Sequence, residues 1–186
     1  MTFSIEEKKL LLSIARESIE SQLLGTKFHF TDFSSIPNFS LKAGAFVTLT
    51  IKNQLRGCIG FIVSDQELYK TVHEVAIEAA FEDPRFPSLS SDELKDVRLE
   101  ISVLSPPFPM KSYDEIELGV HGLILNEKGK RGLLLPQVPI EHEMNKEEYL
   151  DAICQKAGLP KNSWRNKQLN IDLFTAEVFS ENELFS

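Results

Sequence analysis

The stretch AFVTLTIKNQLRGCIGF, residues 45–61, decides the fold that this sequence favours. Residues 45–51 alternate apolar side chains with polar or small ones, which is the pattern of a half-buried strand. The polar residues Lys52, Asn53 and Gln54 then make a turn-like break, and a second extended run follows over 55–63. The stretch therefore predicts an antiparallel hairpin.

Outward from this hairpin, the pattern predicts helices at about 5–24, 65–81 and 146–157, and further strands at about 97–104, 120–125, 132–135 and 171–179. Capping-box pairs support several helix starts, among them Ser4 with Glu7 and Asn145 with Glu148. Gly25 is placed to end the first helix in a left-handed conformation. Hairpins mixed with helices favour an α+β fold, in which helices pack on an antiparallel sheet.

The composition excludes several classes of protein. The chain has 186 residues, 42% of them hydrophobic, which is ordinary for a globular protein and unlike a disordered tail, a collagen-like fibre or a disulfide scaffold. We expect one domain over residues 1–186, with the proline-rich stretch 106–109 as a candidate boundary between two lobes. The formal net charge is −8, and the basic residues are scattered, so nucleic-acid binding is disfavoured.

The two cysteines, Cys58 and Cys154, form no CxxC motif and favour a reducing, cytoplasmic location. No signal peptide and no run of about 20 apolar residues is present, so we expect no membrane association. Cys154 falls on the apolar stripe of a predicted helix and is expected in the core.

The motif LRGCIGF, residues 55–61, is the most informative part of the chain for chemistry. In an extended strand one face carries Leu55, Gly57, Ile59 and Phe61, which is core-like, and the other carries Arg56, Cys58 and Gly60. A cation stabilises a thiolate, and Arg56 would lie roughly 6.5 to 7 Å along the strand from Cys58, beside the open space of a glycine. Alternatively, Cys58 is a small buried residue and the glycines mark close packing.

Five other residues are candidates for a site. Asp83 and Arg85 lie in a loop stiffened by two prolines, where they either face a ligand or form a structural ion pair. His121 lies between glycines at a strand start and is either an acid–base group or a residue bonded to the backbone. Gln137 and Glu141 are polar side chains of the loop that follows strand 132–135.

We identify no metal site and no cofactor from the sequence. The run Glu141-His142-Glu143 lacks the paired spacing of known metal motifs, so a solvated loop is the simpler interpretation. The glycine-rich nucleotide motifs and the GxSxG hydrolase motif are absent from the chain.

At LRGCIGF the sequence resembles the AMMECR family, whose bacterial and archaeal members are called protein A of the AmmeMemoRadiSam system. The resemblance covers about Ala45 to Trp164 and rests on several motifs in the same order: AAFEDPRFPSLSSDEL, LEISVLSPP, GVHGLIL, GLLLPQVPIE and KAGLPKNSW. One departure is Met144, where relatives usually place an aromatic residue, often tryptophan.

The resemblance implies a compact α+β protein of two unequal lobes, the larger containing both termini, with a cleft near the LRGCIG strand. It implies no reaction, because no activity is established for the family. Prokaryotic members are often found beside a Memo-type protein and a radical S-adenosylmethionine (radical-SAM) protein, which makes those proteins its expected partners.

Two hypotheses follow, and whether the protein is an enzyme is left open between them. In the first, it binds a small anionic ligand, with Cys58 and Arg56 as catalytic residues and Gly57, Gly60, Asp83, Arg85, His121, Gln137 and Glu141 as ligand contacts. His121 or Glu141 would then transfer protons. In the second, it is a non-catalytic adaptor for a Memo-like or radical-SAM partner.

Overall fold

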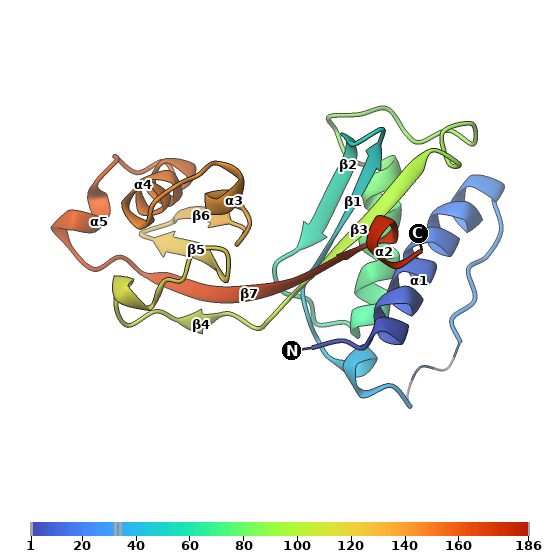
Figure 1. Cartoon of the computed structure of the whole chain (residues 1–186), viewed down its shortest axis with the longest axis horizontal. Helices are drawn as coiled ribbons and strands as arrows, with labels where there is room; N and C mark the ends of the chain where they lie inside the picture. Colours follow the sequence, from blue (N-terminus) through green and yellow to red (C-terminus); the bar gives the residue numbers. More distant parts are fainter. Residues whose placement is uncertain (1, 32, 34, 186) are drawn as a thin grey trace. The chain divides into compact units, whose positions relative to one another are not determined.

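The computed structural model describes residues 2–31, 33 and 35–185, which divide into two compact units (Figure 1). Unit 1 comprises Met1–Leu104 and Glu177–Ser186, and unit 2 comprises Ser105–Ala176.

Unit 1 packs two helices on one face of a sheet. Its elements are α1 (Ile5–Leu24), the short 3-10 helix η1 (Pro37–Ser40), β1 (Ala45–Ile51), β2 (Gln54–Phe61), α2 (Leu68–Phe81), β3 (Val97–Leu104) and α6 (Glu181–Leu184). Unit 2 contains β4 (Phe108–Pro109), the 3-10 helix η2 (Tyr113–Glu115), β5 (His121–Glu127), β6 (Lys130–Leu134), α3 (Val138–Glu141), α4 (Lys146–Lys156) and α5 (Ser163–Asn166). The long strand β7 (Ile171–Ser180) begins in unit 2 and ends in unit 1.

The strands are hydrogen-bonded in the order β2-β1-β3-β7-β5-β6, and β4 also pairs with β7. The pairs β1–β2, β1–β3, β5–β6 and β5–β7 are antiparallel. Helices packed on an antiparallel sheet confirm the predicted α+β class.

The ends of α1 follow from local chemistry. Ser4 and Glu7 form the predicted capping box, and Gly25 ends the helix with φ of 64°. The predicted start of the second helix at residue 65 is wrong, because α2 begins at Leu68. The Ser64 hydroxyl instead accepts a hydrogen bond from the Gln66 amide (3.1 Å).

The β1–β2 hairpin forms as predicted, with one irregularity that changes its faces. Lys52 and Asn53 have φ of 51° and 61°, the conformation of a tight type I′ turn. Thr50 pairs with Leu55 but Leu49 pairs with Gly57, so Arg56 is the extra residue of a β-bulge. The expectation of Leu55 on the core face is therefore wrong: it lies on the face of Thr50 and is 44% exposed.

Helices α1 and α2 cover the other face of the unit 1 sheet (Figure 1). The strand residues buried there are Ala45, Val47, Leu49, Leu99, Ile101 and Val103. The opposite face presents Phe46, Thr48, Thr50, Cys58, Gly60, Arg98 and Glu100, and the short helix α6 contacts β3 beside it. We call it the open face.

Unit 2 has its own core, in which α4 packs on β5 and β6. The predicted capping box of Asn145 and Glu148 starts α4, and Cys154 is buried there as predicted. Lys128 and Gly129, both with positive φ, form the turn of the predicted second hairpin.

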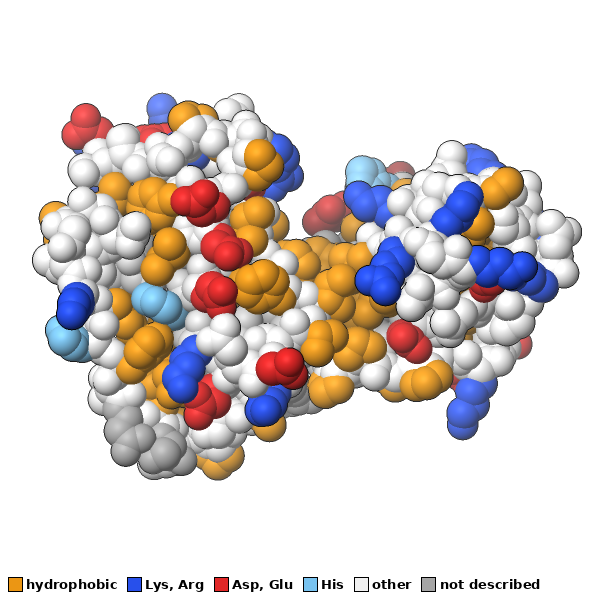
Figure 2. Space-filling view, turned by 180° about the vertical axis from the view of Figure 1, so that it is seen from behind, with side chains coloured by type: hydrophobic (Ala, Val, Ile, Leu, Met, Phe, Trp, Pro, Cys, Tyr) orange, Lys and Arg blue, Asp and Glu red, His pale blue; other side chains and the backbone are white. Residues whose placement is uncertain are grey.

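Acidic side chains form a row on unit 1 in the view of Figure 2. Helix α2 and its end carry Glu74, Glu78 and Glu82 at successive one-turn intervals. Burial and the charges of Glu74 and Glu82 raise the pKa of Glu78. Such a row of carboxylates repels phosphate groups.

Candidate functional site

Asp83 and Arg85 are hydrogen-bonded to the main chain of Cys58 at the outer edge of β2. The Cys58 amide donates to Asp83 Oδ2 (2.9 Å), and Arg85 Nη2 donates to the Cys58 carbonyl (3.1 Å). Since β2 ends the order of strands, no neighbouring strand pairs with it on this side. The two side chains thus take the place of a strand at this point and fix the loop after α2 to Cys58.

The two side chains also form a closed ion pair. Asp83 accepts from the Arg85 amide (3.1 Å), Nε (2.9 Å) and Nη2 (2.7 Å). The carboxylate is buried, with 2% of its side chain exposed, whereas the Arg85 side chain is 53% exposed. The hydrogen bonds from Arg85, together with the one from the Cys58 amide, hold the pKa of Asp83 well below its usual range.

The Cys58 thiol lies beside this arginine. Thr48, the residue opposite Cys58 on β1, donates its hydroxyl to Sγ (3.3 Å). Asp83 raises the pKa of Arg85, and the Cys58 side chain adds a smaller hydrogen-bond and charge contribution in the same direction. The Arg85 guanidinium, which is hydrogen-bonded to the Cys58 carbonyl, is therefore the cation attached to the residue that carries the thiol.

The Arg56 guanidinium bonds to Glu93 and Ser88, in the loop after α2. Its Nε and Nη2 bond to the two carboxylate oxygens of Glu93 (2.7 and 3.1 Å), and Nη2 also reaches the Ser88 carbonyl (3.5 Å). The Arg56 bonds, followed by those of Ser90, lower the pKa of Glu93 to about 2. The expectation that Arg56 shares the face of Cys58 is wrong, because the bulge at Arg56 breaks the alternation of β2.

Both glycines of the motif are packing residues. A Cβ on Gly57 would lie 2.1 Å from the carbonyl oxygen of Ala79, so its absence lets β2 approach α2. A Cβ on Gly60 would lie 2.3 Å from Cγ of Phe46. The expected open space beside Gly60 is therefore filled by the Phe46 ring.

His121 lies in unit 2, at the first residue of β5. The Glu117 amide donates to His121 Nδ1 (3.1 Å), and the Phe108 ring packs edge-on at 6.0 Å between centroids. The sequence left open whether His121 is an acid–base group or is bonded to the backbone. Its Nδ1 atom accepts a backbone hydrogen bond, as in the second alternative. Tyr149 donates its buried hydroxyl toward the carbonyls of His121 and Leu135 (3.2 and 3.1 Å).

Gln137 and Glu141 also lie in unit 2, at the two ends of α3. Gln137 precedes the helix, and its carbonyl accepts from the amides of Ile140 (3.0 Å) and Glu141 (2.9 Å). The Glu141 side chain is exposed. Of the residues predicted from the sequence, Cys58, Asp83 and Arg85 are joined by hydrogen bonds in unit 1. His121, Gln137 and Glu141 belong to unit 2.

Sequence reasoning missed three contributors. Glu93 pairs with Arg56 over a separation of 37 positions, for which the sequence has no local signal. Thr48 faces Cys58 only because of the bulge, since regular pairing from the Lys52–Asn53 turn would set it opposite Gly57. Tyr149 lies within the predicted helix 146–157, but helical periodicity does not show the partners of its hydroxyl.

In the part of the chain that the structure describes, no three His, Cys, Asp or Glu side chains gather as metal ligands would. No helix within those residues is both long enough and apolar enough to cross a membrane. Both cysteines are free thiols.

Comparison with known proteins places this fold and site in one class. The AMMECR1 family model matches residues 12–179, and the chain belongs to this family. A protein of Methanococcus aeolicus is 41% identical, covering 96% of this chain and 92% of its own length. One of Nanoarchaeum equitans is 39% identical, covering 92% and 98%. The crystal structure of the uncharacterized protein PH0010 from Pyrococcus horikoshii matches with a TM-score of 0.81 at 37% identity, over 92% of this chain and 89% of that one.

Proposed function

We propose that unit 1 binds a small anionic ligand at the Cys58 thiol and the Arg85 guanidinium. The observation that carries the proposal is the attachment of the Asp83–Arg85 pair to both main-chain groups of Cys58. This attachment holds a half-exposed guanidinium beside a thiol before any ligand arrives, so little conformational freedom is lost on binding.

The pair leaves hydrogen-bonding capacity for a ligand. Within the described residues, Nη1 of Arg85 makes no hydrogen bond, and its two N–H groups suit a carboxylate or phosphate oxygen. Asp83 accepts from Nε and Nη2 and so orients the guanidinium.

In this proposal Arg85 has the role that the sequence suggested for Arg56. Arg56 is neutralised by Glu93 and links β2 to the turn at Ser88–Ser90. Cys58 is the group through which chemistry would occur if the ligand is a substrate. Binding alone requires only Arg85 and the main chain around it.

The test compares two alkylating reagents that differ in charge. Iodoacetate is an anion and iodoacetamide is neutral, so the ratio of their rates at Cys58 measures local attraction of anions. A unit charge about 4 Å away in a water-like dielectric contributes about 1 kcal/mol, or roughly a fivefold change in this ratio, and the ionised Asp83 that pairs with Arg85 reduces this effect. We therefore expect the ratio in the native protein to exceed that in the urea-unfolded chain by about twofold and by no more than about fivefold.

Peptide mass spectrometry separates Cys58 from Cys154, which is buried and serves as the internal check that the protein stays folded. Arg85→Lys keeps the positive charge and is the matched control, so it should retain most of the preference. A native ratio equal to that of the unfolded chain would show that no anion-attracting site surrounds Cys58.

The association of this protein with Memo-like and radical-SAM proteins, either in a shared pathway or as an adaptor, remains a prediction from the resemblance. Co-purification of tagged protein with such partners from a cell that encodes them tests it. If Cys58 is alkylated no faster than a thiol in the unfolded chain, the result favours the non-catalytic hypothesis, in which the protein is an adaptor.

A further inference from the structure

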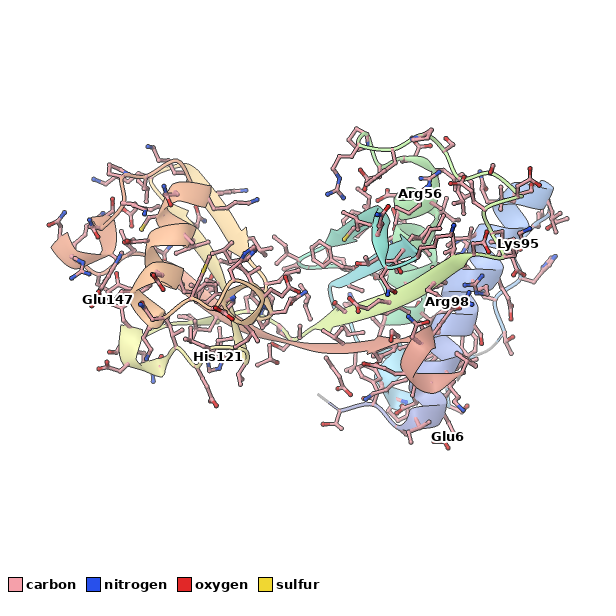
Figure 3. The ribbon with its side chains drawn as sticks, turned by 45° about the horizontal axis from the view of Figure 1, so that its top comes forward. Glu6, Arg56, Lys95, Arg98, His121 and Glu147 are labelled. Carbon is pink, nitrogen blue, oxygen red and sulfur yellow. The ribbon has the colours of Figure 1, made fainter. Side chains whose placement is uncertain are left out.

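A cavity of about 530 Å³ lies within unit 1, away from Cys58 and Arg85. Its lining comes from α1, the start of β3 and the C-terminal segment: Ser13, Arg16, Arg98, Glu181, Asn182 and Phe185. Figure 3 labels Arg98, which lies next to α6. The volume is within the range of small-molecule sites, about 300 to 1,000 Å³.

One wall of this cavity is fixed by a neutral ion pair. Arg16 donates from Nε and Nη2 to the two oxygens of Glu181 (2.5 and 2.6 Å) and also reaches the Val97 carbonyl (2.9 Å). Glu181 in turn accepts from the Leu99 amide (2.9 Å). The opposite charges of Arg16 and Glu181 thus cancel, and their geometry is held by the main chain of β3.

Three other polar side chains have hydrogen-bonding capacity that unit 1 does not use. Arg98 donates from Nη1 to the main-chain carbonyls of Val97 (3.0 Å) and Lys95 (3.4 Å), and no carboxylate among the described residues forms an ion pair with it. Ser13 and Asn182 make no side-chain hydrogen bond within the described residues. The charge left over on the lining is therefore the positive charge of Arg98, which selects an anion.

The acidic residue near Arg98 is Glu100, which lines a different cavity. An adjoining cavity of about 220 Å³ shares Arg98 and Asn182 and includes Glu100. An anion is therefore expected on the side of Ser13, where the described lining residues include no carboxylate other than the paired Glu181.

The cavity also offers an aromatic surface. The Phe185 ring is 54% exposed, and the ammonium of Lys9 lies 5.6 Å from its centroid. Lys9, Ser13 and Arg16 are spaced four and three residues apart, so they share one face of α1. An exposed ring beside cations suits a planar, electron-rich ring system by stacking.

From the spare guanidinium, the two unused polar side chains and the exposed ring, we propose that this cavity binds a phosphate monoester that carries a planar ring, the class of a nucleoside monophosphate. The phosphate would bond to Arg98, Ser13 and Asn182, and the ring would stack on Phe185. The proposal is independent of the thiol site, because none of its residues contacts Cys58.

Calorimetric titration of the full chain with AMP tests the proposal. We expect saturable binding, weakened about tenfold or more in Arg98→Gln, since a charged hydrogen bond is lost. Phe185→Leu should weaken AMP several-fold, and adenosine, which lacks the phosphate, should bind at least about tenfold more weakly than AMP.

Arg131→Gln, a charge-matched change at an exposed position of β6, should leave AMP binding unaltered, as should Cys58→Ala. Absence of saturable binding at millimolar AMP would overturn the proposal. Equal affinity of wild type and Arg98→Gln would overturn it as well. Since the Cys58 variant is unaffected in the expected case, failure here leaves the alkylation result at Cys58 intact.

Discussion

Asp83→Asn is the substitution that the structure most clearly predicts to be damaging. The carboxylate accepts four hydrogen bonds, from the Cys58 amide and from the amide, Nε and Nη2 of Arg85. Asparagine keeps the shape but turns one acceptor into a donor that faces these donors. Removing one partner of a buried ion pair costs about 3–5 kcal/mol. Because Arg85 is half-exposed and can be hydrated, we expect about 2–3 kcal/mol.

The pH dependence of this loss provides a second test. The pKa of Asp83 is lowered in the folded state, so its stabilisation is fully present above the unfolded pKa of about 3.9 and is lost as the pH falls further. The variant has no such group to protonate. The difference in unfolding free energy between wild type and Asp83→Asn should therefore shrink from pH 7 to pH 3.

Urea unfolding followed by circular dichroism measures the effect in unit 1, which contains the long helices α1 and α2. The single tryptophan, Trp164, reports on unit 2 by fluorescence. Asp92→Asn, at an exposed residue of the same loop, is the control and should change stability by less than about 0.5 kcal/mol. Equal stabilities for Asp83→Asn and Asp92→Asn would refute the proposed role of the pair.

Two further substitutions test the packing around the candidate residues. Gly57→Ala sets a Cβ 2.1 Å from the Ala79 carbonyl oxygen and should destabilise unit 1 by about 2–3 kcal/mol. Gly129→Ala in unit 2, where no atom lies within 4 Å and only the positive φ is strained, should cost about 1 kcal/mol in Trp164 fluorescence. A smaller cost for Gly57→Ala than for Gly129→Ala would contradict the close approach of β2 to α2. Tyr149→Phe should lower the stability of unit 2 by about 1 kcal/mol in Trp164 fluorescence, because the hydroxyl bonds to the carbonyls of His121 and Leu135, and an unchanged transition would show those bonds to be unimportant.

Local chemistry was sufficient to predict the three long helices and six of the strands of this fold, but not the short elements β4, α3, α5 and α6. Capping residues and a terminal glycine define α1, and alternation defines β1 and the turn at Lys52–Asn53. These signals lie within a few residues of the structure they specify, so the sequence carries them directly.

The arrangement of the site depends on a β-bulge and on contacts between residues far apart in the sequence, which these local signals do not specify. The extra residue at Arg56 places Leu55, which precedes the bulge in β2, on the face opposite to the one that alternation predicts. The alternation of apolar and polar residues in a sequence does not reveal a bulge. The choice of partners, Glu93 for Arg56 and the Cys58 main chain for Asp83 and Arg85, depends on how the loop after α2 packs against β2. The sequence identified Arg56, Cys58 and Arg85 as candidates, and the contacts of the folded chain lead us to propose Arg85 as the cation for Cys58.

The comparison of Arg85→Gln with Arg56→Gln tests the central claim most directly. The measured quantity is the ratio of iodoacetate to iodoacetamide rates at Cys58 in each folded variant. We predict that Arg85→Gln lowers the ratio to that of the unfolded chain or below it, because the Asp83 carboxylate then lacks its partner, while Arg56→Gln leaves it close to the wild-type value. A ratio that falls in Arg56→Gln and persists in Arg85→Gln would contradict the assignment of Arg85 as the cation of this site.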